Sequence, residues 1–305
     1  MKEFPTDCPF PARLDHELYD HRRSLEVNAA AWPGGHRVAS FILIRVQCLE
    51  LEPPPGALRD PRWNTDFGTF APPYRAHSLM EYGNRIGVFR LLDFLQPLGW
   101  RVAISVNGMI AQQTPSFVRA FVDRGVEVLA SGWSASRMIS NALDAQTENT
   151  WLKQSLDALA QVTGHCPRAY ASQDYGYSSR SADLLAQLGI HTTVDWPNDE
   201  KPFYFGTNRA IVNLPVFSEL EDSQMIINRK LQTPAWIRQL QTALGAWPEM
   251  ASPGSIMALP LHAWISGVPH RFSQFREAML RADPDRFWQA SPSEIASQWR
   301  ADNKP

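Results

Sequence analysis

The feature that most constrains the fold of this chain is a regular alternation of short apolar runs with longer amphipathic runs. The apolar runs are typical of buried strands, and they lie at 37–46, 100–106, 126–130, 168–171, 190–194, 211–216 and 256–261. Helical spacing and helix stop signals predict the intervening helices at 80–95, 116–123, 151–162, 181–187, 234–244 and from 273 onward. Strands that alternate with helices indicate parallel strands joined by crossover helices.

We therefore predict an α/β fold, a distorted (β/α) barrel of about seven parallel strands. The alternative is an open, doubly wound sheet, which would favour a glycine-rich phosphate-binding turn after the first strand. The residues at that point are Gln47-Cys48-Leu49-Glu50, which do not resemble such a turn.

The first 36 residues are polar and interrupted by prolines, so we expect an N-terminal arm at 1–36 and a single barrel domain at 37–305. The proline-rich segment 50–78 shows few periodic positions. We expect it to form a long loop over one mouth of the barrel, and loops of this length are usually functional.

Composition excludes several classes of partner. With 44% hydrophobic and 20% charged residues and a net charge of −2, the chain has no electrostatic basis for binding nucleic acid or an acidic membrane surface. No apolar run is long enough to span a membrane, and no signal peptide is visible. Three scattered cysteines indicate reduced thiols and a cytoplasmic location. Eleven tryptophans favour an aromatic-lined pocket or the subunit interface of a homo-oligomer, although core packing explains them equally well.

Polar and aromatic side chains collect where the predicted strands end. If the strands are parallel, these ends share one face of the barrel, the usual place for chemistry in such folds. The set is poor in basic residues and suits a small neutral or amide-bearing ligand better than a phosphate. Asn107 and Ser131 have an alternative role as helix caps, and Asp195 or Asp199 as turn residues. The residues at the strand ends are Gln47, Asn107, Ser131, Trp133, Gln173, Asp174, Asp195, Trp196 and His262.

Motifs at these positions resemble the polysaccharide deacetylase superfamily, in particular the branch of cofactor-free allantoinase and cyclic imide hydrolase. They span about 30–282, and as a set they are specific. The resemblance implies a roughly seven-stranded (β/α) barrel that hydrolyses a non-peptide C–N or N-acyl bond. The matching motifs are Glu81-Tyr82-Gly83-Asn84-Arg85, Ala130-Ser131-Gly132-Trp133, Ser136-Arg137, Asp183-Leu184-Leu185-Ala186, Asp195-Trp196-Pro197-Asn198-Asp199, Leu214-Pro215, Glu219-Leu220-Glu221-Asp222 and Leu261-His262-Ala263-Trp264, followed by Gly267, Pro269, His270 and Arg271.

The chain departs from this family where the family binds metal. Metal-dependent members place an Asp pair after the first strand and two histidines in a His-Gly-Tyr/Trp-x-His motif. The corresponding residues here are Gln47, Ser131 and Ala135. An amide, a hydroxyl and a methyl group cannot make a divalent metal site, so we expect no metal and no other cofactor. In the cofactor-free branch a Glu ends the first strand and a His precedes the Gly-Tyr/Trp, and both are absent here.

Two functions remain compatible with these departures. The first is a metal-independent hydrolase of a small molecule, in which His262 acts as general base toward water or toward Ser131. Its orienting carboxylate could be Asp195, Asp199 or Asp222, and we place Asp195 in the catalytic set with His262 and Ser131. The second is a catalytically silent relative that binds a small amide or scaffolds an active partner. The residues expected to contact the ligand are Gln47, Asn107, Trp133, Asp174, Trp196, Asp199, Asp222 and Trp264.

Overall fold

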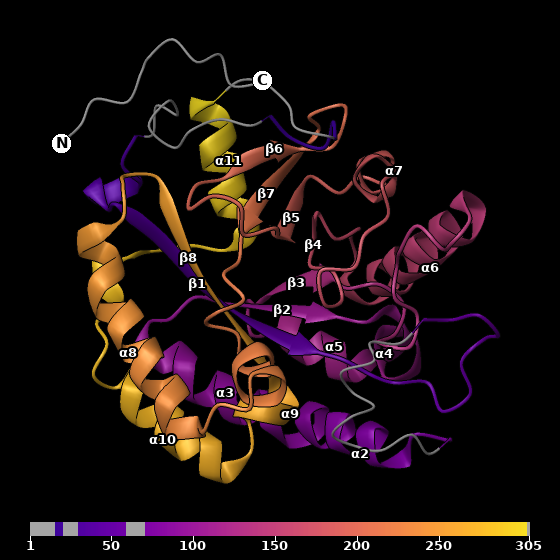
Figure 1. Ribbon diagram of the computed structural model, residues 1–305, viewed down its shortest axis with the longest axis horizontal. Helices are drawn as coiled ribbons and strands as arrows, with labels where there is room; N and C mark the ends of the chain where they lie inside the picture. The colour runs from indigo at the N-terminus through magenta and orange to yellow at the C-terminus, as the bar shows by residue number, and fades with distance from the viewer. Residues whose placement is uncertain (1–15, 21–29, 59–70, 304–305) are drawn as a thin grey trace.

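The computed structural model describes residues 16–20, 30–58 and 71–303. In these ranges seven strands run parallel in one curved sheet, in the order β7-β5-β4-β3-β2-β1-β8 (Figure 1). They confirm the predicted α/β barrel class, and their ends lie within two residues of the predicted ones. The strands are β1 (Val38–Val46), β2 (Val102–Val106), β3 (Glu127–Ala130), β4 (Ala169–Tyr170), β5 (Thr192–Asp195), β7 (Ile211–Pro215) and β8 (Ser255–His262).

Two further strands were not predicted, because each is too short to show a period-2 pattern. The strand β6 (Phe203–Phe205) pairs antiparallel with β7, and β9 (Trp288–Gln289) pairs parallel with β1. The strands β7 and β8 lie next to each other, but no hydrogen-bonded ladder joins them among the described residues. The barrel is therefore open along this seam.

Helices surround the sheet, and most match the predicted ones. The helices α4, α9 and α11 were not predicted, and α2 begins at Tyr74, which shortens the predicted loop 50–78. Positions 59–70 of that loop lie outside the described residues. The helices are α2 (Tyr74–Tyr82), α3 (Val88–Leu95), α4 (Gly108–Gln113), α5 (Pro115–Val122), α6 (Ala145–Thr163), α7 (Ser181–Gln187), α8 (Thr233–Met250), α9 (Ala263–Ser266), α10 (Pro269–Met279) and α11 (Pro292–Asp302).

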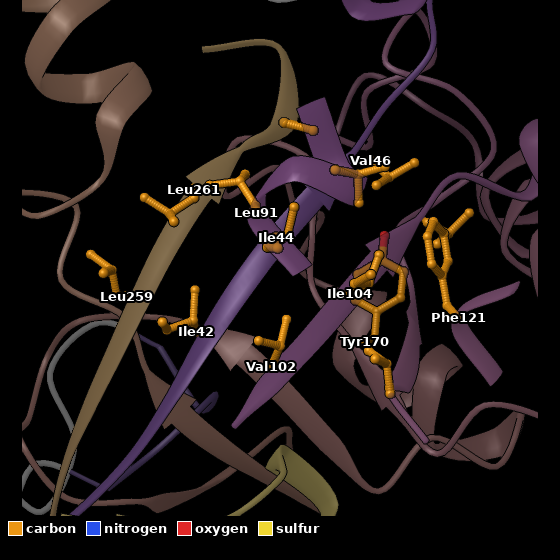
Figure 2. Close-up of a cluster of buried hydrophobic side chains, with 14 of the residues drawn as sticks. Ile42, Ile44, Val46, Leu91, Val102, Ile104, Phe121, Tyr170, Leu259 and Leu261 are labelled. Carbon is orange, nitrogen blue, oxygen red and sulfur yellow. The ribbon is translucent and has the colours of Figure 1, made fainter. Parts of the chain in front are cut away.

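The strands have two apolar faces because successive side chains point to opposite sides. Figure 2 shows part of the outer face, where Ile44 of β1 lies near Leu91 of α3 and Ile42 lies between Leu259 of β8 and Val102 of β2. The inner face carries Phe41 and Leu43 of β1, with alternate residues of the neighbouring strands.

Helix α11 closes the barrel at the end where the strands begin. Its Ile295 and Trp299 pack on the inner-face cluster. Arg300 donates to the carbonyl oxygens of His191 and Ala210, which precede β5 and β7. The opposite end, where the strands terminate, is therefore left for the polar groups.

The first described segment, 16–20, lies against β6. The carbonyl oxygen of Leu18 accepts from Gly206 N at 2.8 Å, and the Tyr19 ring packs edge-on to Phe203. The rest of the predicted arm before residue 30, at 1–15 and 21–29, lies outside the described residues. Among the helices of the described ranges, none combines the length and the apolar character needed to cross a membrane.

Candidate functional site

An aspartate holds the strand-end histidine at two points. His262 ends β8 and is fully buried. Its backbone N–H donates to Asp222 Oδ2, and its ring Nδ1 lies 2.8 Å from Asp222 Oδ1. Ser266 Oγ donates to the same carboxylate at 2.6 Å. Because a carboxylate only accepts, the neutral imidazole carries its proton on Nδ1, and Nε2 is the atom that can take a proton.

The sequence left three aspartates open as the partner of His262, and the structure shows that Asp222 is the one hydrogen-bonded to it. Asp195, which we placed in the catalytic set from the sequence, is not this partner. Its carboxylate accepts from Ser172 N and Oγ at 2.9 Å each and from Tyr177 OH at 2.5 Å. Asp199 Oδ1 accepts from the backbone N–H groups of Glu200 and Lys201, so Asp199 turns the chain after β5.

Burial shifts the acidity of Asp195. Removal of the carboxylate from water raises its pKa to about 6, against the opposing effects of Arg45, Tyr177 and Ser172. Asp195 therefore changes charge close to neutral pH.

A buried arginine, which sequence reasoning missed, lies between Ser172 and Glu221. Arg45 of β1 is 1% exposed and follows the inner-face residues of that strand. Its Nη1 donates to the carbonyl oxygen of Ser172 at 2.7 Å, and its Nε lies 3.2 Å from Glu221 Oε1. Burial lowers the pKa of Arg45, but the nearby Glu221, Tyr175 and Asp195 together raise it by more. The net shift of the pKa is therefore upward, and the guanidinium stays charged. The available signal was a charged residue inside an otherwise apolar strand, which requires a buried partner.

Several buried side chains at the ends of β1 to β4 have polar atoms without a hydrogen-bond partner among the described residues. We call Gln47, Ser105, Ser131 and Gln173 the strand-end ring; each is at most 4% exposed. The atoms without a hydrogen-bond partner in the described part of the chain are both amide atoms of Gln47, the hydroxyls of Ser105 and Ser131, and Gln173 Nε2. Leaving such a buried group unsatisfied costs about 1–3 kcal/mol. The ring is therefore suited to a small ligand that both donates and accepts hydrogen bonds.

The Gln173 amide of the strand-end ring lies close to the backbone of Gly132. Gly132 has a φ of 64°, and a Cβ added to it would lie 3.4 Å from the amide carbon of Gln173. The Gln173 amide therefore lies beside the residue that follows Ser131. Ser131 Oγ makes no hydrogen bond to His262 in the described part of the chain, so a direct Ser–His pair is not formed.

The residues at the family's metal positions do not fit a metal ion. Gln47 and Ser131 offer an amide and a hydroxyl, and Ala135 packs in an apolar cluster with Leu49 and Met80. No group of three or more His, Cys, Asp or Glu side chains in the described ranges is arranged to bind a metal. The charged guanidinium of Arg45 adds a fixed positive charge at the same end of the barrel.

Asn107, a predicted ligand contact, ties two strand ends together. Its Oδ1 accepts from Cys48 N at 2.9 Å and its Nδ2 donates to the Ser131 carbonyl oxygen at 2.6 Å. It does not cap α4 with its side chain. Its amide is therefore occupied in holding Gln47 and Ser131 at their places.

The three predicted tryptophans lie in different surroundings. Trp264 is buried, with its ring 6.1 Å from the ring of His262. The buried Trp133 stacks with Arg137, whose Cζ is 5.7 Å from its ring and which forms a two-point ion pair with Glu50. Trp196 packs in an aromatic cluster with Tyr177 and Phe205.

The turn after β4 has an unusual backbone. Asp174 and Tyr175 have φ values of 47° and 60°, a region that non-glycine residues adopt at a cost of about 1–3 kcal/mol. This turn directs the Tyr175 hydroxyl to Glu221 Oε2, at 3.1 Å. The position of Glu221 is thus fixed from two sides, by Tyr175 and by Arg45.

The fold and the motifs at the strand ends define the class of protein. Residues 81–193 match the family model of polysaccharide deacetylase. Together with the parallel barrel, this confirms the resemblance to the polysaccharide deacetylase superfamily that is seen in the sequence.

Individual relatives are distant. The chain is 21% identical over 221 residues to a peptidoglycan deacetylase of Helicobacter pylori, a match that covers 72% of this chain and 65% of that protein. The structure resembles Puue allantoinase with a TM-score of 0.74 at 20% identity, over 92% of this chain and 98% of the other. It also resembles a CE4 family pseudoenzyme from Bacillus anthracis, with a TM-score of 0.51 at 10% identity, over 86% and 67% of the two chains.

Proposed function

We propose that this chain is a metal-independent hydrolase of a carbon–nitrogen bond in a small amide, cyclic amide or N-acyl compound. The observation that carries the proposal is the buried Asp222–His262 pair at the same end of the barrel as the strand-end ring. The matching family and the allantoinase-like fold support hydrolysis of this kind of bond.

In the proposed reaction His262 Nε2 is the general base, oriented by Asp222. It removes a proton from water as the water oxygen bonds to the substrate carbonyl carbon, and the carbonyl electron pair moves to oxygen. The carbonyl re-forms as the C–N bond breaks, and the proton on Nε2 passes to the leaving nitrogen. A base of this kind contributes about 10²–10⁴-fold.

Water is the nucleophile in this proposal because Ser131 makes no hydrogen bond to His262. Ser131 and the other members of the strand-end ring would instead bind the substrate. Amide and hydroxyl groups can donate to a carbonyl oxygen and accept from an N–H, which suits a neutral amide.

The test is turnover of a panel of neutral substrates by the purified protein, with and without a chelator. The panel contains hydantoin, succinimide, dihydrouracil, allantoin and N-acetylglucosamine, with products followed by chromatography. We expect turnover of at least one compound that survives chelation and is lost in His262→Asn. His165→Asn is the matched control, because His165 is exposed beyond the end of α6. Turnover that is lost when the chelator removes metal, or that persists in His262→Asn, would contradict the proposal.

A second function has support of its own. The amide, hydroxyl and methyl side chains at the family's metal positions are also what a catalytically silent relative would carry, and a CE4 family pseudoenzyme has a similar fold. On this alternative the strand-end ring binds a small amide without converting it. Calorimetric binding of a panel compound with no turnover, equally in wild type and His262→Asn, would favour it.

A further inference from the structure

Glu221 is a second carboxylate beside the histidine, on the side opposite to Asp222. Its side chain is 2% exposed. One oxygen, Oε2, accepts from Tyr175 OH, and the other, Oε1, lies 3.2 Å from Arg45 Nε. Neighbours in sequence, Glu221 and Asp222 thus flank the two nitrogens of one imidazole.

The distance between Glu221 and His262 carries the inference. Glu221 Oε1 lies 3.9 Å from His262 Nε2. This is too long for a hydrogen bond, but it is the separation at which one water molecule, roughly 2.8 Å from each atom, can bridge two polar groups.

We propose that Glu221 is a catalytic residue which, with His262, holds the attacking water. This inference rests on the hydrolase function proposed above. One O–H of the water donates to His262 Nε2 and the other to Glu221 Oε1, so that a lone pair of the oxygen is directed to the substrate carbonyl carbon. In the step, His262 takes its proton, the C–O bond forms and the carbonyl electron pair moves to oxygen. Glu221 keeps the second O–H of the former water oriented and takes no proton.

Arg45 acts through Glu221 as a positioning residue. The carboxylate has several rotamers, and the charged guanidinium together with Tyr175 OH selects the one that brings Oε1 to 3.9 Å from Nε2. The ion pair also compensates the cost of burying the Glu221 charge, which would otherwise be several kcal/mol.

The kinetic experiment compares Glu221→Gln with Glu219→Gln on the panel compound that wild type converts. Glu219 lies in the same turn, but its side chain is 71% exposed and pairs with Arg229. Glu221→Gln keeps the shape of the side chain but replaces one acceptor oxygen with an N–H₂ donor and removes the negative charge. We expect kcat to fall by about 10²-fold in Glu221→Gln with little change in KM, and to stay unchanged in Glu219→Gln. Equal kcat values in the two variants would overturn the inference.

The role of Arg45 is tested by a double-mutant cycle. Arg45→Met should lower kcat with little change in KM, and Arg45→Met/Glu221→Gln should lower it no further than Glu221→Gln alone. Additive losses would show that Arg45 does not act through Glu221.

A crystal structure of the wild-type protein tests the inference without turnover. We expect an ordered water within about 3.2 Å of both His262 Nε2 and Glu221 Oε1. A side chain occupying that position, or separation of the two atoms beyond the reach of one water, would overturn the inference even if a substrate is found. If the water is present and no panel compound is converted, the catalytic role of Glu221 fails together with the hydrolase proposal. If a compound is converted and the water is absent, only the role of Glu221 is overturned.

Discussion

Asp222 contacts His262 through both of its carboxylate oxygens, one on the backbone N–H and one on ring Nδ1, each at 2.8 Å. A single side chain therefore fixes both the end of β8 and the orientation of the ring. Asp222→Asn replaces one acceptor oxygen with a donor, which favours the wrong tautomer of the imidazole. We expect kcat to fall by at least about 10²-fold, while the circular dichroism spectrum is retained. Asp157→Asn is the control, since Asp157 is exposed and pairs with Lys153. Retained turnover in Asp222→Asn would exclude the orienting role.

Ser131→Ala should separate binding from stability. The hydroxyl is buried without a partner in the described residues, so its removal should leave the free energy of unfolding unchanged or raise it by about 1 kcal/mol. Loss of a hydrogen bond to the substrate should raise KM about 10-fold. Urea unfolding and steady-state kinetics measure the two effects. An acyl adduct trapped on Ser131 would contradict this prediction and make Ser131 the nucleophile.

Asp195 should make stability depend on pH. Its pKa is raised from 3.8 to about 6 in the folded protein, so the folded state binds the proton more tightly than the unfolded state. The free energy of unfolding should therefore fall as pH rises from about 4 to about 6, by an amount on the order of 3 kcal/mol from this group. Asp195→Asn cannot titrate and should lose this contribution. Unfolding curves at pH 4 and pH 7 measure it, and an identical pH dependence in both proteins would exclude it.

The close contact between Gly87 and α9, the helix that follows His262, should be necessary for stability. The π-helical turn η3 (Gly83–Gly87) lies directly against α9, and a Cβ on Gly87 would overlap the Ala263 carbonyl oxygen. Gly87→Ala should lower the free energy of unfolding by about 2–3 kcal/mol through overpacking. Gly245→Ala is the control in α8, where a Cβ meets no atom within 4 Å, and it should be neutral or stabilising by up to about 1 kcal/mol. Equal effects of the two changes would show that the contact is not tight.

Most of the fold could be predicted because the seven buried strands and their helices carry periodic patterns. The partner of His262 could not be chosen, since Asp195, Asp199 and Asp222 all follow strands and only tertiary structure separates them. Arg45 was missed for a different reason: its neighbours Ile44 and Val46 made the run appear as an apolar strand. Gln47, Ser131 and His262 were singled out because they stand where the strands end.

The buried ion pair of Arg45 and Glu221 restricts the order in which this sequence can change. Metal ligands introduced at Gln47, Ser131 and Ala135 would share the end of the barrel with this buried ion pair. Removing Arg45 alone would leave the Glu221 charge buried and uncompensated, a loss of about 3–5 kcal/mol. Arg45 and Glu221 can therefore be exchanged without a loss of this size only if both change together.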